Sequence, residues 1–569
     1  MDRIQTPVAN FQLGDSGVCT ECQKLFESIA KAKSMKVQVT VDYYFRSHYE
    51  SAMAVQESRR NGCKVCTLFI EAYGFEAFEK DSKAPKEAIG SPGPPNVPQI
   101  YLDNQKDRWT IGLRLRDKIE YDQMIIFAPS VDRNSVAPIH EIIRPSTSNY
   151  LPIAKHWLKE CVEKHEHCVK SDRQVPPTRL LYLGGDRIRL IHTAKSPDIQ
   201  LQYATLSHAW GSIKFFRLCK ENLKDLQDCV PEKELTKTFR DAVYITRSLG
   251  LEYLWIDSLC IIQDDEQDWL RESGLMSSVY GGSTINIAAA DSLDGNGGCL
   301  YDEMATITTR KAFRYRLRMA DLQDERPWEL VPVYLYPHCT SWSHLASRAW
   351  ALQERLLAPR TLQFSKTDML WECHEKDACS LFPDGLPQSL CGHYTYREKA
   401  SLASIWDLVV ELYSAAKLTR YSDKSVALSG LAYAVQCETG DEYVAGMWRK
   451  DLEAQLLWSV RPHKWEVPRP RPYRAPTWSW AALDSKIFSA DTSTGHLYAH
   501  IHSVYTQPIG SSSLGQISGG LLTVSCSVLM RGTTTSKDDL DVEDQEEFES
   551  QSNAAALNFG GDTTFAKIS

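Results

Sequence analysis

The sequence lacks the features that identify several large classes of protein. No apolar run approaches the roughly 20 residues of a membrane-spanning helix, and residues 1–17 lack the charged-then-apolar pattern of a secretory signal. The net charge is −9, so there is no general basic field to attract nucleic acid. We therefore expect a cytoplasmic protein with no membrane span and no nucleic-acid partner.

Three common catalytic motifs are also missing. The chain contains no G-x-x-x-x-G-K-[ST], no G-x-G-x-x-G after a strand and no G-x-S-x-G. Nucleoside-triphosphate hydrolysis, dinucleotide redox chemistry and hydrolase-fold acyl transfer therefore lack support. Ser207 and His208 are adjacent at a strand end, so their side chains project to opposite faces and cannot act as nucleophile and base to each other.

The composition indicates a folded chain of several units. With 569 residues, 43% hydrophobic and 24% charged, it can bury a full core. Shifts in composition predict six regions. The first three are a helical region with paired cysteines (1–81), a Pro/Gly linker (82–98) and a small α+β segment (99–200). The core domain (201–357), a C-terminal α+β region (358–531) and an acidic tail expected to be disordered (532–569) follow.

The core is organised around residues 203–290, where strand and helix patterns alternate. A helix starting at Thr238 and stopped by Gly250, and a second helix capped by Asp264 and Asp265, separate three apolar strands. The strands are expected at Tyr203–Leu206, Tyr253–Ile262 and Thr284–Ala290. This order predicts the α/β class, with a parallel sheet flanked by helices.

One carboxylate lies on the apolar face of the second predicted helix. Glu272 falls within the arc formed by Trp269, Met276, Val279 and Tyr280. Burying a carboxylate is costly, so it would need a raised pKa or a specific ligand. The alternative is a glutamate at the edge of the arc that reaches solvent or a nearby arginine, such as Arg240 or Arg247.

Open parallel sheets bind ligands beyond the carboxyl ends of their strands. In this chain that edge gathers Glu272 with a set of candidate substrate-binding residues: Ser207, His208, Trp210, Asp257, Ser258 and Asp264. Trp210 either stacks on a ring of the ligand or packs in the core. Asp257 is expected to be a hydrogen-bond acceptor.

Two groups of cysteines are candidate metal ligands. Cys19 and Cys22 form one C-x2-C pair and Cys63 and Cys66 another, so together they are predicted to bind structural zinc, with His48 as a substitute ligand. The alternative is four buried thiols. In the second group, helix packing is favoured over a metal site for Cys161, His165, His167 and Cys168.

The chain after the core strands is less regular. Residues 291–345 are interpreted as a long insertion with short strands that lines one rim of the site. Arg348–Leu357 is predicted to be a short helix, and its neighbours Glu354 and Arg355 should point apart and pair with other groups. Strands are expected at Thr361–Phe364 and Met369–Cys373.

Three blocks of sequence closely resemble the signature blocks of the fungal heterokaryon-incompatibility (HET) domain: YATLSHAWG, DAVYITRSLGLEYLWIDSLCIIQDDEQDWLRESGLM, and SRAWALQERLLAPRTLQF followed by WEC. The resemblance implies a role in non-self recognition and regulated cell death, with an unidentified protein partner. It also implies a core distantly similar to Toll/interleukin-receptor (TIR) domains. Some of that wider group cleave NAD with a glutamate on a helix after a central strand, a position that Glu272 matches.

These observations favour the hypothesis of a cell-death effector that cleaves NAD at the nicotinamide glycosidic bond. NAD would be the substrate and not a cofactor, and Glu272 would stabilise the positive charge that develops on the ribose. The competing hypothesis is a non-catalytic module that forms homo-oligomers and recruits partners in the same pathway. Whether the protein is an enzyme is left open by the sequence.

Overall fold

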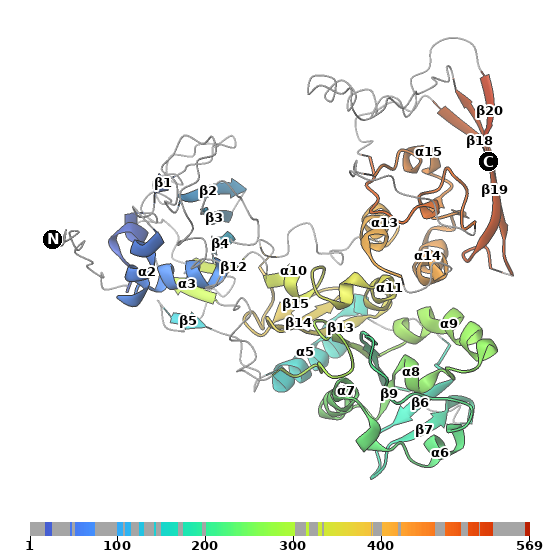
Figure 1. Ribbon diagram of the computed structural model, residues 1–569, viewed down its shortest axis with the longest axis horizontal. Helices are drawn as coiled ribbons and strands as arrows, with labels where there is room; N and C mark the ends of the chain where they lie inside the picture. Colours follow the sequence, from blue (N-terminus) through green and yellow to red (C-terminus); the bar gives the residue numbers. More distant parts are fainter. Residues whose placement is uncertain are drawn as a thin grey trace, which may run out of the picture.

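The computed structural model (Figure 1) is described over the following residues: 17–24, 46–47, 52–73, 99–105, 108–114, 124–129, 141–143, 150–168, 175–195, 201–301, 314–317, 328–332, 335–387, 390, 401–418, 423–460, 473–490, 499–510, 512–526 and 564–568. Within these residues, no helix combines the length and the apolar character that crossing a membrane requires. The possible ligand His48 lies outside them.

An eight-stranded sheet forms the core, in the order β15-β14-β13-β10-β8-β9-β6-β7. Its four central strands are parallel: β9 (Tyr253–Trp255), β8 (Tyr203–Ser207), β10 (Ile285–Ala289) and β13 (Arg360–Phe364). Antiparallel strands complete both sides: β6 (Arg179–Tyr182), β7 (Arg189–His192), β14 (Met369–Cys373) and β15 (Asp377–Cys379). The predicted α/β class is confirmed.

The parallel strands are ordered as in doubly wound folds. Along the chain, the parallel strands come in the order β8, β9, β10 and β13, which we number 1 to 4. Across the sheet they lie in the order β9, β8, β10, β13, which is 2-1-3-4. In such sheets the strand order reverses between strands 1 and 3, and ligands bind at the carboxyl ends beside that point. In this chain the reversal lies between β8 and β10.

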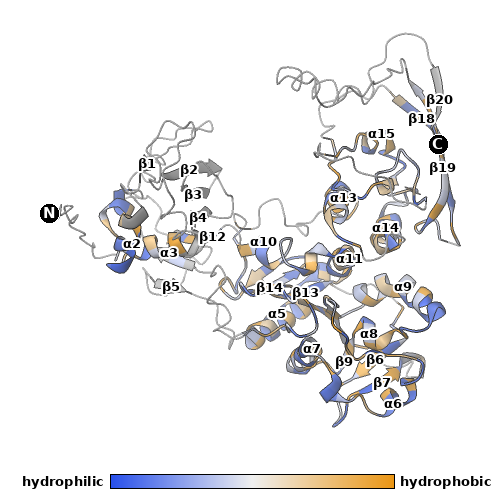
Figure 2. Cartoon of the chain, in the orientation of Figure 1, coloured by the Kyte–Doolittle hydropathy of each residue, from blue (hydrophilic) through white to orange (hydrophobic). Residues whose placement is uncertain are grey.

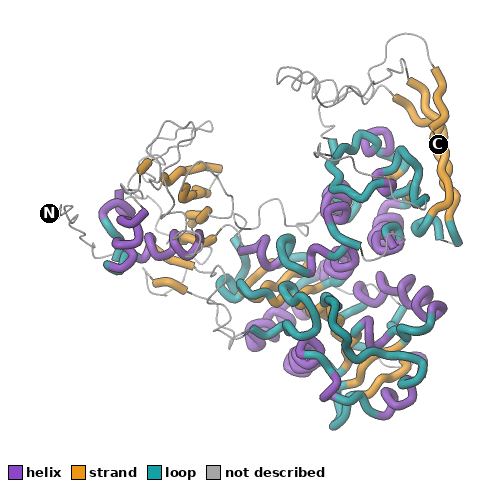
Figure 3. Tube along the Cα trace, in the orientation of Figure 1, coloured by secondary structure: helices purple, strands orange, loops and turns teal. Residues whose placement is uncertain are grey.

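Helices cover both sides of these strands (Figure 3). α7 (Lys237–Ser248) connects β8 to β9 and contacts α5 (Tyr150–Lys164), whereas α9 (Glu266–Gly281) connects β9 to β10 and contacts α11 (Ala349–Leu357). Thr236, two residues before the predicted start, caps α7 by accepting a bond from the Phe239 amide. Asp265 alone caps α9, accepting bonds from the amides of Gln267 and Asp268.

The expected strand over Tyr253–Ile262 is wrong in its second half. β9 ends at Trp255, and residues Asp257–Cys260 form a helical turn, α8. The Asp257 carboxylate accepts a hydrogen bond of 2.6 Å from the Ser258 amide, which favours the turn. Leu259 and Cys260 are still buried, and a short buried apolar run does not distinguish strand from helix.

A second sheet combines strands from distant parts of the sequence. Its order is β1-β2-β3-β4-β12-β11-β5, and all its pairs are antiparallel. Its strands are Arg46–Ser47, Gln99–Gln105, Arg108–Arg114, Met124–Pro129, Trp328–Pro332, Arg314–Leu317 and Glu141–Ile143, in that order. The insertion at 291–345 thus supplies β11 and β12. Helices α2 (Ala52–Arg60) and α3 (Lys64–Tyr73) lie beside this sheet in Figure 1, and α3 itself is coloured largely hydrophobic in Figure 2.

The C-terminal region packs on the core through its helices. α13 (Trp406–Ala415) and α14 (Val426–Thr439) both contact α11, and α14 also contacts α9. Beyond α15 (Leu452–Gln455), strands β18 (Ala499–Pro508), β19 (Ile517–Cys526) and β20 (Thr564–Ile568) form a separate sheet. β20 lies within the tail 532–569, which was expected to be disordered. This part of the tail forms a strand because its residues, unlike the acidic residues before them, favour strands.

Replacing Trp255 tests the packing of the core. Trp255 is fully buried on β9 and its ring meets that of Tyr280 on α9, with centroids 5.6 Å apart. We expect Trp255→Ala to lower the free energy of unfolding by about 3–5 kcal/mol, because a large cavity would remain. Tyr244→Ala, on the exposed side of α7, should change it by less than about 0.5 kcal/mol. Denaturant titration of both variants measures the difference, and equal losses would contradict this packing.

Candidate functional site

One face of the central sheet carries polar side chains where apolar ones are usual. The register places Thr205 beside Asn286 and Asn286 beside Thr361, and places Ser207 and Gln363 on either side of Ala288. All these polar residues are buried. Parallel strands covered on both faces normally carry almost continuous apolar residues, so this polar row needs an explanation.

A cavity of about 290 Å³ lies over this polar row. Its floor includes Ser207, Asn286, Thr361 and Gln363, and its walls come from the segment 340–347 and from helices α11 and α13. Ligand pockets have volumes of about 300–1,000 Å³, so this cavity can enclose a small ligand or one part of a larger one. It adjoins the reversal point between β8 and β10.

Two buried atoms in the cavity floor have no hydrogen-bond partner among the residues that the structure describes. They are Nδ2 of Asn286 and Oγ1 of Thr361. Oδ1 of Asn286 accepts bonds from the hydroxyls of Thr205 and Ser207, at 3.0 and 3.1 Å, which fixes the amide and leaves Nδ2 as a donor. A buried polar atom without a partner costs about 1–3 kcal/mol. A polar ligand in the cavity would remove that cost.

A buried acid lies next to this floor. Glu354 on α11 is 9% exposed, and burial raises its pKa to about 7. The hydroxyls of Ser207 and Tyr280 and the guanidinium of Arg348 lower the pKa in part, and Asp257 raises it further. A carboxyl group with this pKa can accept and donate a proton near neutral pH.

Arg355, the residue after Glu354, fixes α11 to the sheet. Arg355 donates from Nε to Oε2 of Glu372 at 2.9 Å and from Nη2 to Oε1 at 2.5 Å. Glu372 also accepts bonds from Gln363 and from the hydroxyl of Tyr336. The prediction that Glu354 and Arg355 pair with different groups is confirmed. Arg355 also lines the cavity, so this ion pair shapes its wall.

Three of the sequence-predicted residues meet beside Ser207. Trp210 donates from Nε1 to Oδ2 of Asp257 at 3.0 Å, and Nε2 of His208 lies 3.9 Å from Oδ1. Burial lowers the pKa of His208. Asp257 is thus a hydrogen-bond acceptor, as expected. The Trp210 ring packs edge-on against Phe215 and does not line the cavity.

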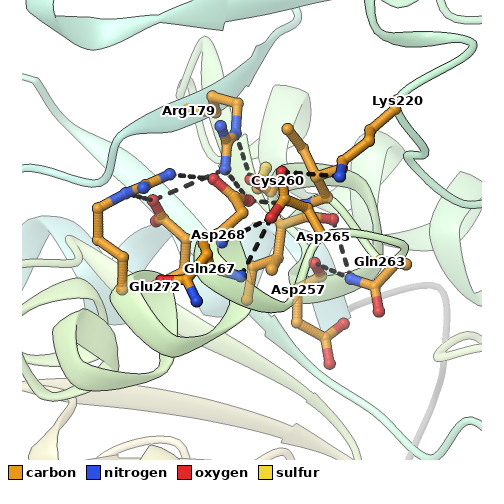
Figure 4. A network of polar contacts seen from close by, with 12 residues as sticks. Arg179, Lys220, Asp257, Cys260, Gln263, Asp265, Gln267, Asp268 and Glu272 are labelled. Atoms are coloured by element: carbon orange, nitrogen blue, oxygen red, sulfur yellow. Dashed lines mark hydrogen bonds and ion pairs between the residues drawn. The ribbon is translucent and has the colours of Figure 1, made fainter.

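Three other predicted residues lie away from the cavity lining. Ser258 is fully buried in α8, and its hydroxyl makes no hydrogen bond within the described part of the chain. Asp264 accepts a bond of 2.8 Å from the Lys220 amide. Glu272 is buried, but it belongs to a different network of charges (Figure 4).

The network around Glu272 is centred on Arg179 of β6. Oε1 of Glu272 lies 3.6 Å from Nη2 of Arg179 and 3.5 Å from Nε of Arg271. Arg179 also donates to Asp268 and, at 2.7 Å, to the Cys260 carbonyl. Figure 4 shows the Asp257 carboxylate pointing away from this network. The alternative of a glutamate at the edge of the arc is wrong, because Glu272 is fully buried. Its arginine partners are Arg179 and Arg271 and not the suggested Arg240 and Arg247.

The four N-terminal cysteines converge in the structure. Their sulfurs lie 3.8 Å apart for Cys19 and Cys66, 3.6 Å for Cys22 and Cys66, and 3.9 Å for Cys63 and Cys22. Tetrahedral zinc with Zn–S bonds of about 2.3 Å requires edges of about 3.8 Å, whereas a disulfide requires about 2.05 Å. This buried cluster could therefore hold a metal ion such as zinc, and the prediction that the two pairs come together is confirmed.

Sequence reasoning did not identify most of the cavity. Asn286, Thr361 and Gln363 sit within apolar strand patterns, and the sequence indicates only that Glu354 is a helix residue that needs a partner. A polar residue inside an otherwise apolar strand was the available signal. The segment 340–347 belongs to the insertion expected to line one rim of the site, and it does line this cavity.

Comparison with known proteins gives one match. Residues 203–354 match the family model described as "Heterokaryon incompatibility protein (HET)". The match includes β8, β9, β10 and most of α11. Searches of curated proteins and of solved structures found nothing that matches the chain.

Removing Arg179 tests whether Glu272 is held as part of an ion-pair network. We expect Arg179→Met to lower the free energy of unfolding by about 3–5 kcal/mol, because two carboxylates would remain buried without this cation. Adding Glu272→Gln should restore part of the loss. Arg187→Met, at an exposed position, serves as the control in the same denaturant titrations. A loss no larger than the control's would contradict the network.

The raised pKa of Glu354 predicts a pH-dependent stability. Folding raises this pKa from 4.5 to about 7, so Glu354 contributes stability below pH 4.5 and loses it as the pH rises to about 7. The stability of Glu354→Gln relative to the natural protein should therefore increase by about 3 kcal/mol across this range and stay constant above it. Glu234→Gln, at an exposed position, should show no such change. Denaturant titrations from pH 4 to pH 9 measure both.

Proposed function

We propose that this chain, a protein with a heterokaryon-incompatibility (HET) domain, acts in fungal non-self recognition and regulated cell death by cleaving NAD at the nicotinamide glycosidic bond. The observation that carries the proposal is the polar cavity at the reversal point of the sheet, with a protonatable acid beside it. The protein would work in the cytoplasm, on that compartment's NAD, and its recognition partner would be another protein.

The cavity has the groups that a ribose would need. Its buried floor offers the Asn286 amide and the hydroxyls of Ser207 and Thr361, which can hydrogen-bond to the hydroxyls of a sugar. Its volume suits the nicotinamide riboside end of NAD, so the adenosine end would lie outside. Trp342, at 45% exposure in the cavity wall, offers a ring face for stacking.

The chemistry requires little help at the leaving group. The bond between C1′ of the ribose and the ring nitrogen breaks, and nicotinamide leaves neutral with the bonding electron pair. Water then adds at C1′ and loses a proton to a base. Ionised Glu354 would accept that proton and would stabilise the positive charge on the ribose. The Ser207 hydroxyl, which lies beside Glu354, would orient the water.

Two glutamates are candidates for this role. Glu272, expected from the sequence, is on the helix that follows a central strand, as the proposed TIR-like architecture requires. Arg179 and Arg271 lie 3.6 and 3.5 Å from Oε1 of Glu272 and already balance its charge. Neither glutamate lines the cavity, but Glu354 has no such ion pair among the described residues and lies beside Ser207, which belongs to the cavity floor. The contacts therefore favour Glu354 as the base.

The test is the release of free nicotinamide from NAD by the purified full chain. We expect the natural protein to release nicotinamide at a rate that rises with pH to a plateau above about pH 7, because Glu354 must be ionised to act as a base. Glu354→Gln should reduce the rate by about 100-fold or more. Glu234→Gln is the matched control and should retain the full rate.

Other outcomes have distinct meanings. If a folded Glu272→Gln variant loses the activity and Glu354→Gln keeps it, the catalytic role belongs to Glu272 and the assignment to Glu354 is wrong. If no variant and no natural protein releases nicotinamide while overexpression still kills cells, NAD cleavage is wrong. The oligomerising, non-catalytic module would then account for the family's role.

A further inference from the structure

We propose that Cys161, His165, Cys168 and Cys373 bind a structural zinc ion that fastens α5 to the turn between β14 and β15. The ligand atoms of these four residues all lie within 4.8 Å of one another, and the three cysteines are buried. This site is separate from the N-terminal cysteine cluster and from the cavity, and it does not depend on the proposed activity.

The geometry suits a tetrahedral ion. Nδ1 of His165 lies 3.4 Å from Sγ of Cys373 and 3.9 Å from Sγ of Cys168. Zn–S bonds of about 2.3 Å and Zn–N bonds of about 2.0–2.1 Å require S···N edges of about 3.6 Å, and the two distances bracket that value. Three cysteines and one histidine are a common donor set for structural zinc.

The local structure explains why these residues converge. Cys161 is in the last turn of α5, and His165 directly follows the helix with its amide bonded to the Cys161 carbonyl, so both lie on one side of the helix end. The short helix Glu166–Cys168 returns Cys168 to the same side. Cys373 ends β14, and its turn is closed by hydrogen bonds between Cys373 and Lys376. Lys376 also pairs with Glu160 of α5 at 2.8 Å, which holds the turn against the helix.

The surroundings are those of thiolate ligands. Nε of Arg360 donates to Sγ of Cys161 at 3.1 Å, and the Lys376 amide donates to Sγ of Cys373 at 3.2 Å. Zinc with three thiolates and one neutral imidazole carries a net charge of −1, which the guanidinium of Arg360 balances. Such donors outside the coordination sphere orient metal ligands and tune their affinity.

The site joins segments on either side of the matched domain. His165 and Cys373 are 208 residues apart, and the segment between them contains β8, β9 and β10. The sequence favoured helix packing because Cys161 and His165 share a helix face with apolar residues. The fourth ligand, Cys373, is too distant in the sequence for a local pattern to indicate it. His167 is not part of the cluster; its backbone amide donates to Glu375 at 2.7 Å.

Metal analysis of the full chain, purified under reducing conditions, tests this site. We expect two zinc ions per natural chain, one in Cys373→Ser, one in Cys22→Ser and none in the double variant. Cys299→Ser removes a buried cysteine outside both clusters and should keep two. Cys373→His replaces the sulfur ligand with a nitrogen ligand and should also keep two.

A spectroscopic measurement avoids dependence on the folding of Cys373→Ser. When Cys22→Ser protein is loaded with cobalt, it should show the thiolate-to-cobalt charge transfer and the intense visible bands of a tetrahedral site. A Cys373→Ser variant that keeps the natural zinc content would overturn the proposal. So would cobalt-loaded Cys22→Ser protein without charge-transfer absorption.

Discussion

The structure depends on how polar groups are satisfied inside a sheet covered on both faces. The strands β8, β10 and β13 bury hydroxyl and carboxamide groups on a face where apolar side chains would cost less free energy to bury. The Arg355–Glu372 ion pair holds α11 over this face, and Glu372 also accepts the Gln363 amide. The same arrangement leaves Nδ2 of Asn286 and Oγ1 of Thr361 without partners in a cavity. A core built only for stability would have filled or paired these positions.

Two buried glutamates illustrate opposite solutions to the cost of burying a carboxylate. Glu272 shares Arg179 with Asp268, so its charge is compensated inside the network. Glu354 has hydroxyls beside it and Arg348 nearby, and burial raises its pKa to about 7. A charge already neutralised by arginine is poorly suited to stabilise a new cation on a substrate, whereas an acid that titrates near neutral pH can exchange protons. The two environments therefore separate a structural pair from a candidate reactive group.

The sequence predicted what depends on local pattern and missed what depends on distant partners. The order of strands and helices over 203–290, the cap at Asp265 and the position of Glu272 on the apolar face of its helix all follow from residues within a few turns of each other. Arg179 lies 89 positions before its partner Asp268, and no periodicity links them. The end of β9 at Trp255 was missed because Leu259 and Cys260 remain buried in a helical turn as they would be in a strand. The strands β11 and β12 join a sheet begun near the N-terminus, which no local pattern encodes.

The matched residues 203–354 are only part of the folded unit to which they belong. They supply three of the eight strands in the core sheet, whereas β6 and β7 precede them and β13, β14 and β15 follow. The cavity floor needs Thr361 and Gln363 of β13, and its wall needs α13. The cysteine–histidine cluster joins α5 to β14 across the same span. Because the edges of the sheet and part of the cavity floor come from outside the match, the flanking segments are part of the site's architecture, and the site is complete only when they are folded with the domain.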